Sequence, residues 1–223
     1  MSFLQREELI GTARAMNAAG LNVGTAGNLS IRTRRGFLIT PTGMPYDSLR
    51  PSDVVEVAWG GEASGSRLPS SEWRMHLGVY SSKQEVEAIL HCHSPYATAV
   101  SCLRRSIPAF HYMVAVAGGT DVRCAAYATF GTEELAHNAV EALQDRRACL
   151  LANHGMLVLG ASLERALALA LEVENLARQY AIALSAGEPV VLDEREMAVI
   201  LEKFKTYGQQ KPGRPQLARV GNG

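Results

Sequence analysis

The sequence predicts a single α/β domain. Stretches with helical periodicity alternate along residues 1–208 with short apolar runs typical of buried strands, and no internal repeat or linker separates them. Hydrophobic residues make up 47% of the 223 residues and charged residues 20%, which suits a chain that buries one sizeable core. Residues 209–223 are rich in Gly, Pro and basic side chains, and we expect them to form a disordered tail.

The charge balance excludes two broad classes of partner. Lys and Arg total 22 and so do Asp and Glu, so a formal net charge of zero argues against a binder of nucleic acid or of anionic membranes. No stretch approaches the roughly 18–20 apolar residues that span a bilayer, and we find no signal peptide. The cysteines are too few and too scattered for a disulfide framework: Cys92, Cys102, Cys124 and Cys149. We therefore expect a cytoplasmic protein.

The first part of the chain is expected to contain one helix and three strands. Ser2 and Gln5 form a capping-box pair at the start of a helix over residues 3–19, and Gly20 ends it. Four apolar residues at helical spacing define its buried face: Leu9, Ile10, Ala13 and Met16. Three runs of strand-forming residues follow, separated by Gly and Pro turns: residues 29–32, 36–40 and 54–59.

The rest of the chain alternates between helices and strands. Ser70 and Ser71 are expected to cap a helix that starts at Glu72. Four further runs are expected to be strands: residues 86–93, 122–127, 148–152 and 156–159. A helix over residues 95–103 is predicted to start at Pro95. Three more are predicted to start at the capping residues Thr132, Ser162 and Asp193, and they cover residues 132–143, 162–186 and 193–207. The longest of them has these expected core positions: Leu167, Leu171, Val173 and Leu176.

Three histidines and one glutamate form a candidate metal site. His91 and His93 lie on one face of their predicted strand, about 7 Å apart, and Cys92 points to the other face. His154 follows another predicted strand at a turn, and Glu72 lies in the first turn of its helix. Three imidazoles and a carboxylate suit a divalent metal such as zinc. A His-x-His pair alone is weak evidence, and the remaining helical histidines, His76 and His137, are expected to serve packing or the surface.

Three small-residue loops could bind an anion without a lysine. They contain hydroxyl groups, an amide and accessible backbone N–H groups, and they lie at residues 25–28, 42–43 and 70–71. Neither a Walker lysine motif nor a G-x-G-x-x-G fingerprint is present, which argues against a nucleotide. The alternative for each loop alone is a simple turn or cap. Because Ser71 directly precedes Glu72, however, the order predicts a small phosphorylated substrate next to a metal ion.

Five motifs together resemble the class II aldolase/adducin family. They are GTAGNLS (24–30), ITPTG (39–43), PSSE (69–72), HCH (91–93) and NHG (153–155). Three further segments resemble its aldolases more closely: SIPAFHYM (106–113), YATFGT (127–132) and KFKTYG (203–208). The resemblance covers residues 1–208 as one catalytic domain. It implies three α/β/α layers with a central, mostly antiparallel sheet flanked by helices, assembled as a cyclic homotetramer with active sites between subunits.

The resemblance also implies roles for individual residues. One Zn²⁺ per subunit is expected on four ligands: Glu72, His91, His93 and His154. The phosphate group is expected on Thr25, Asn28, Thr42, Gly43, Ser70 and Ser71. Glu72, displaced from the metal by substrate, would move a carbon-bound proton. Tyr112 of a neighbouring subunit would handle the proton on the aldehyde oxygen, while Phe130 and Tyr207 shape the aldehyde end.

The implied reaction is the reversible cleavage of L-fuculose 1-phosphate to dihydroxyacetone phosphate and L-lactaldehyde. Several alternatives share the metal and phosphate residues: an aldolase for 5-deoxypentulose 1-phosphates, a pentulose-phosphate 4-epimerase and a methylthioribulose-1-phosphate dehydratase. An adducin-like interaction module would lack the ligand set, which is present here. Asp121 matches no assigned motif and is a candidate to alter the substrate pocket.

Overall fold

A computed structural model describes residues 3–206. Its centre is one eight-stranded sheet in the order β4-β3-β2-β1-β5-β8-β7-β6. Neighbouring strands are antiparallel except β6 and β7, which are parallel, so the expected mostly antiparallel sheet is confirmed. The strands are β1 (Asn28–Thr33), β2 (Gly36–Ile39), β3 (Val55–Ala58), β4 (Ala63–Ser64), β5 (Ala88–Cys92), β6 (Arg123–Ala125), β7 (Ala148–Leu151) and β8 (Gly155–Gly160).

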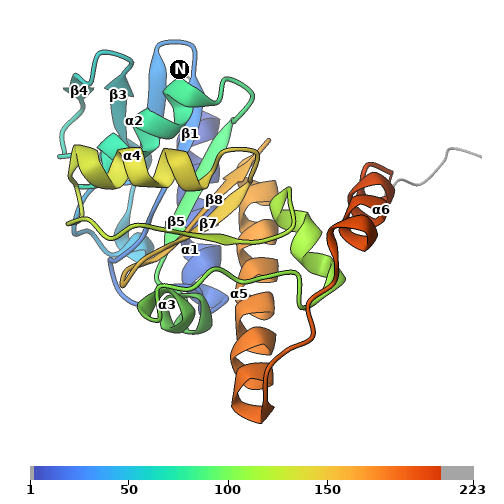
Figure 1. Cartoon of the computed structure of the whole chain (residues 1–223). Coiled ribbons are helices and arrows are strands. Elements are labelled where there is room, and N and C mark those ends of the chain that lie inside the picture. Colours follow the sequence, from blue (N-terminus) through green and yellow to red (C-terminus); the bar gives the residue numbers. More distant parts are fainter. Residues whose placement is uncertain (1–2, 207–223) are drawn as a thin grey trace, which may run out of the picture.

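Helices cover both faces of the sheet, as expected for three α/β/α layers (Figure 1). On one face α1, α3 and α5 pack over the central strands, and on the other face α2 packs beside α4. The helices are α1 (Phe3–Ala18), α2 (Trp73–Ser82), α3 (Pro95–Cys102), α4 (Glu133–Ala142), α5 (Leu163–Ala186) and α6 (Glu194–Phe204). Three short 3₁₀ helices complete the described chain: η1 (Tyr46–Ser48), η2 (Pro51–Asp53) and η3 (Tyr112–Ala117).

Two hydrophobic cores follow the alternation of side chains along the strands. On β5, Leu90 and Cys92 belong to the core under α1 and α5, whereas Ile89 belongs to the core under α2 and α4. All four apolar residues predicted for α1 are buried in the first core. A separate small core joins α6 to η3, and these two elements project together at one end of the molecule (Figure 1).

Most predicted boundaries agree with the structure to within a few residues. Thr132, Ser162 and Asp193 each accept a backbone N–H at a helix N-terminus, which confirms the three caps. β4 was not predicted, because two residues carry no periodicity. Ser2 and the tail after Thr206 lie outside the described residues. Within residues 3–206, no helix is long and apolar enough to cross a membrane.

Two predictions are wrong. Leu171 on α5 is 42% exposed, because the buried stripe of this helix runs through small residues such as Ala166, Ala170 and Ala177. Leu171 lies on the opposite side of the helix from this stripe and therefore faces solvent. The serines before α2 are also not its N-cap. Glu72 occupies that position, and its own N–H donates to Ser70 Oγ at 3.3 Å.

Candidate metal centre and substrate cavity

Four side chains from three parts of the fold converge at one point. Glu72 precedes α2, His91 lies on β5, His93 follows that strand, and His154 lies in the turn between β7 and β8. Each offers one ligand atom, and these four atoms all lie within 4.8 Å of one another. The Nε2 atoms of His91 and His93 are 3.0 Å apart. The Glu72 carboxylate lies 3.1 Å from His91 Nε2 and 3.3 Å from His154 Nε2.

The sheet explains why these histidines meet. Cys92 is buried in the core on the opposite face from His91, so the expectation that it points away from the site is confirmed. β8 pairs beside β5 and brings the turn containing His154 to the end of β5. Gly155 makes this approach possible, because a Cβ there would lie 2.5 Å from the Cys92 carbonyl oxygen. Asn153, just before His154, adopts a left-handed backbone with φ of 54°.

Charges in the cluster favour an ionised carboxylate between imidazoles. Burial alone would raise the pKa of Glu72, but His91, His154 and Asn28 outweigh it and hold that pKa well below its usual range. Burial also lowers the pKa of His91, and Glu72 more than reverses this, so the His91 pKa is raised. Burial and the neighbouring His91 lower the pKa of both His93 and His154 to about 4. Two imidazoles are therefore neutral near pH 7.

This donor set fits a divalent cation. Glu72 Oε1 is buried and has no hydrogen-bond partner within the described structure, which is costly unless something else binds it. Three imidazole nitrogens and a carboxylate oxygen match the ligands found at catalytic zinc sites.

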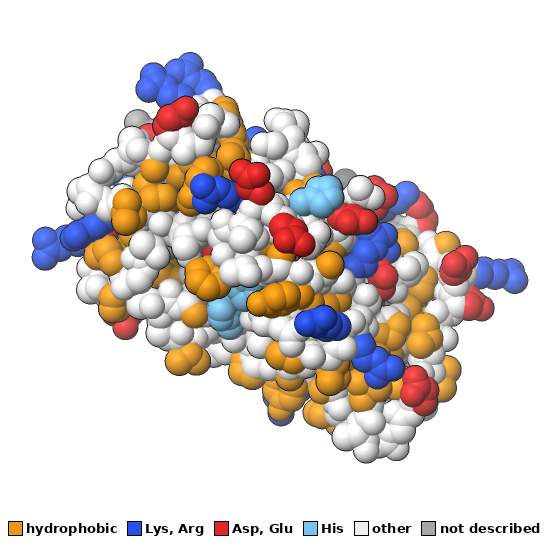
Figure 2. All heavy atoms as spheres, turned by 60° about the vertical axis from the view of Figure 1, so that its left-hand side comes forward, with side chains coloured by type: hydrophobic (Ala, Val, Ile, Leu, Met, Phe, Trp, Pro, Cys, Tyr) orange, Lys and Arg blue, Asp and Glu red, His pale blue; other side chains and the backbone are white. Residues whose placement is uncertain are grey.

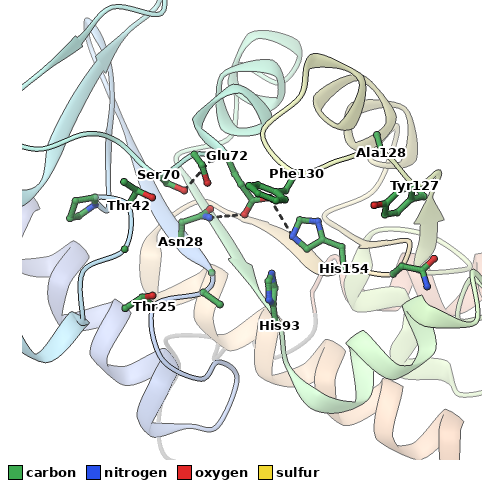
Figure 3. A pocket seen from close by; sticks show the side chains of 16 residues that line it. Thr25, Asn28, Thr42, Ser70, Glu72, His93, Tyr127, Ala128, Phe130 and His154 are labelled. Carbon is green, nitrogen blue, oxygen red and sulfur yellow. Dashed lines mark hydrogen bonds and ion pairs between the residues drawn. The ribbon is translucent and has the colours of Figure 1, made fainter.

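A cavity of about 300 Å³ opens beside the cluster. In Figure 3, Thr25, Thr42 and Ser70 lie on one side of it and Tyr127 lies on the opposite side, with Glu72, His93 and His154 between them. Every residue expected to bind phosphate lines this cavity: Thr25, Asn28, Thr42, Gly43, Ser70 and Ser71. Phe130 lines it as well. No Lys or Arg is among its described lining residues. An anion here would therefore meet hydroxyl groups and amide dipoles rather than formal positive charge.

The loop at residues 25–28 lies close to the strand that carries His91. Gly27 has φ of 61°, and a Cβ there would lie 2.8 Å from the carbonyl oxygen of His91. Tyr46 braces the same turn, since its hydroxyl donates to the Gly27 carbonyl at 2.7 Å. Only glycine allows both the left-handed turn and this contact with β5. The loop is thereby fixed against the strand that carries His91.

The side chain of Asn28 is already engaged. Its Nδ2 donates to Glu72 Oε2 at 3.0 Å, and its Oδ1 lies 2.6 Å from His76 Nε2. Asn28 therefore contacts the carboxylate of the cluster as well as lining the cavity. His76 is fully buried and bonded to Asn28, so an assignment to packing alone is incomplete. His137 is exposed, as predicted.

Two sequence candidates lie away from this cavity, and a third is not described. Tyr112 is 46% exposed on η3, its ring stacks on His111 at 4.8 Å, and it does not line the cavity of its own chain. Asp121 pairs with Arg146 at 2.7 Å and is not a lining residue of this cavity either. Tyr207 lies outside the described residues.

Sequence reasoning missed several lining residues. Tyr127 and Asn153 line the cavity, and Arg104 connects them, because its Nε donates to Asn153 Oδ1 at 2.8 Å and its guanidinium lies 5.7 Å from the Tyr127 ring. The remaining ones are Pro41 and Ala128. Their proximity in sequence to predicted site residues was the available signal, since Asn153 adjoins His154 and Tyr127 is near Phe130.

The molecular surface agrees with the neutral composition. Figure 2 shows one face on which acidic and basic side chains are interspersed, with histidine side chains visible among hydrophobic ones. Such a face offers no broad electrostatic attraction to a polyanion.

Comparisons with known proteins identify the family. The family model of the class II aldolase and adducin N-terminal domain matches residues 7–181. The chain belongs to this family, and its fold, its metal-binding group and its relatives define it as a class II aldolase, which is a lyase. Metal dependence is a property of class II aldolases.

Two curated relatives are similar to the same degree but carry different names. A 5-methylthioribulose-1-phosphate/5-deoxyribulose-1-phosphate aldolase of Rhodospirillum rubrum is 52% identical over 212 residues, covering 94% of this chain and 96% of that protein. An L-fuculose phosphate aldolase of Escherichia coli is 50% identical over 202 residues, covering 90% and 94%. The solved structure of an L-fuculose 1-phosphate aldolase matches with a TM-score of 0.89 and 46% identity, covering 92% of this chain and 98% of that one.

Proposed function

We propose that this protein is a zinc-dependent aldolase that reversibly cleaves L-fuculose 1-phosphate to dihydroxyacetone phosphate and L-lactaldehyde. One observation carries the proposal. Glu72 belongs both to the group of metal-ligand atoms within 4.8 Å of one another and to the lining of the hydroxyl-rich cavity. A phosphate bound by the loops would thus hold a short sugar chain beside the metal ligands. We propose residues 1–208 as the catalytic domain.

The phosphate-binding loops orient the substrate. Thr25, Thr42 and Ser70 present hydroxyl groups on one side of the cavity, with Asn28 beside them (Figure 3). Gly43 and Ser71 also line the cavity. Neutral donors bind a phosphate group through directed hydrogen bonds, which fix its orientation. A substrate held there extends across Glu72 toward Tyr127 and Phe130.

The proposed metal ligands are Glu72, His91, His93 and His154. Zinc bound by them would supply positive charge opposite the oxygens on which negative charge grows during cleavage. The bond between the third and fourth carbons breaks, and the electron pair stays on the three-carbon phosphate. The hydroxyl proton of the departing fragment leaves as its aldehyde forms, and a proton added to the three-carbon fragment completes dihydroxyacetone phosphate.

Glu72 is proposed to add the proton that completes dihydroxyacetone phosphate during cleavage, and to remove the same carbon-bound proton in the synthesis direction. Its depressed pKa keeps the carboxylate ionised near pH 7, as a base that removes a proton in the synthesis direction must be. Asn28 Nδ2 fixes one carboxylate oxygen at 3.0 Å, while the other oxygen has no hydrogen-bond partner in the described structure. That second oxygen is buried and lies 3.3 Å from His154 Nε2, so it would reach the reacting groups once substrate displaces Glu72 from the cluster.

The aldehyde end is proposed to be completed by a neighbouring subunit. Phe130 lines the cavity with 65% of its surface exposed, so this end is open within one chain. Tyr112 is exposed on η3 and away from its own cavity, which suits a role in the site of a neighbour in a cyclic homotetramer. There it would transfer the proton on the aldehyde oxygen. Tyr207 is proposed to act at the same end of the substrate.

We also propose that the enzyme is cytoplasmic.

A second candidate substrate comes from the relative in Rhodospirillum rubrum, which is as similar as the one in Escherichia coli. Cleavage of a 5-deoxyribulose or 5-methylthioribulose 1-phosphate would use the same metal ligands and phosphate loops and release a different aldehyde. Ratios of kcat/KM for the three sugar phosphates decide between them.

The first test follows hydrogen exchange in dihydroxyacetone phosphate by NMR, in deuterated water with zinc-loaded protein. Stereospecific loss of one hydrogen from the hydroxymethyl carbon, stopped by a chelator and restored by zinc, is the expected result. Absence of exchange in protein shown to contain zinc would overturn the aldolase proposal. The epimerase and dehydratase alternatives, and a binding module without chemistry, would then be tested next.

A further inference from the structure

A line of buried polar side chains runs from the metal-ligand cluster into the core under α2. Asn28 and Ser30 lie on the same face of β1, and His76 and Tyr80 lie one helical turn apart on α2. None of the four is more than 3% exposed. Such a line is costly in an apolar core unless every donor finds an acceptor.

The contacts are consistent with only one arrangement of hydrogens. An ionised carboxylate can only accept, so the 3.0 Å contact with Glu72 requires the amide nitrogen of Asn28 on that side. The amide oxygen of Asn28 then faces His76 Nε2 at 2.6 Å, and this contact is a hydrogen bond only if Nε2 carries a hydrogen. Burial lowers the pKa of His76 to about 3, so the ring is neutral and its Nδ1 carries none.

The hydroxyl groups of Ser30 and Tyr80 continue this series of hydrogen bonds in the same direction. Ser30 Oγ lies 2.6 Å from His76 Nδ1 and must donate to it. The Ser30 hydrogen is then used, so the Ser30 oxygen accepts from the Tyr80 hydroxyl at 2.9 Å, while the Glu87 carbonyl oxygen is a more distant acceptor for that hydroxyl at 3.5 Å. Hydrogen bonds therefore run in one direction, from Tyr80 through Ser30 and His76 to Asn28, and end on the Glu72 carboxylate.

We propose that His76 is a positioning residue for Glu72: its Nε2–H fixes the amide of Asn28 so that the N–H, and not the carbonyl, faces the carboxylate. The opposite tautomer would favour a flipped amide, with two oxygens in repulsive contact at the metal ligands. A packing histidine would not need this alignment, because an apolar side chain could fill the space beside Phe37, whose ring centre is 6.4 Å from that of His76. The inference rests on the proposed metal site.

Metal affinity tests the effect on Glu72. His76→Leu removes the donor, whereas His76→Gln keeps an N–H near the position of Nε2, and Tyr80→Phe removes a buried hydroxyl at the far end of the line. Supporting groups behind metal ligands typically change affinity about 10–100-fold. We expect His76→Leu to weaken Co²⁺ binding, measured by chelator competition, by roughly that factor, while His76→Gln and Tyr80→Phe stay near wild type. Unchanged affinity in a folded His76→Leu variant would overturn the proposal, as would an equal loss in Tyr80→Phe.

A readout on the metal-free wild-type protein avoids dependence on variants that fail to fold. Long-range ¹H–¹⁵N NMR distinguishes a protonated ring nitrogen from a bare one, and we expect hydrogen on Nε2 of His76 and none on Nδ1. A wild-type ring protonated on Nδ1 overturns the inference. Failure of the wild-type protein to bind Co²⁺ would instead overturn the proposed metal centre, and the NMR result then decides on His76 separately.

Discussion

Ser94 Oγ donates to Glu174 Oε2 at 2.6 Å, which ties the residue after His93 to the middle of α5, 80 positions later in the chain. Glu174 Oε1 also accepts the N–H group of Tyr96, and Oε2 accepts that of Ala97, each at 2.8 Å. Ser94 is the N-cap of α3 by position, but its own side chain caps nothing. A carboxylate from another helix therefore provides the cap, and negative charge at a helix N-terminus is favourable.

Glu174→Ala should destabilise the protein by about 2 kcal/mol, because three donors around a buried serine lose their acceptor. Denaturant unfolding gives the free energy of unfolding directly. Glu172→Ala, two residues earlier on α5, is the matched control and should change it by less than roughly 0.5 kcal/mol. Equal losses in both variants would show that the Ser94 contact contributes nothing specific.

Glu72→Gln should lower kcat by about 10²–10⁴-fold, because an amide cannot act as the base for the carbon-bound proton. Inhibition by inorganic phosphate should persist, since the hydroxyl groups of the loops are intact. Glu56→Gln, on β3 at a partly exposed position, serves as the control. A Glu72→Gln enzyme with wild-type turnover would remove this residue from the reaction.

Metal affinity should depend on pH chiefly through His91. The pKa of His93 and His154 is about 4, so above pH 5 both are already neutral, and Glu72 is already ionised. The pKa of His91 is raised above its ordinary value, so its proton must leave when the metal binds. The logarithm of the Zn²⁺ binding constant should therefore rise with a slope of about one between pH 5 and the His91 pKa, and level off above it. A flat profile over this range would contradict the charges described for the cluster.

Thiol reactivity should separate the cysteines into two groups. Cys102 is exposed and Cys124 partly exposed, whereas Cys92 and Cys149 are buried. Burial raises the pKa of Cys92 to about 12, so at pH 8 the thiol stays protonated, and only the thiolate reacts. A thiol reagent should label Cys102 quickly, Cys124 slowly and the buried pair only after unfolding. Labelling of Cys92 on removal of the metal alone would indicate that it takes part in the metal site.

Local sequence signals predicted most of the elements and the composition of the candidate site. Side-chain alternation placed His91 and Cys92 on opposite faces, and hydroxyl or carboxyl caps marked the starts of α4, α5 and α6. These signals succeed because they depend on the geometry of a single strand or a single helical turn. Both resemblance and residue types pointed to Glu72 and the three histidines.

Only the tertiary structure decided which faces meet. The order β1-β5-β8 brings Asn28, His91 and the turn before β8 together, although they lie far apart in the sequence. Packing of α2 against the sheet then engages the side chain of Asn28 with His76, and the face that α5 turns to the sheet leaves Leu171 exposed. The physical reason is that the sequence pattern fixes the face on which a side chain lies, whereas its partner depends on strand order, register and the closeness of approach between layers.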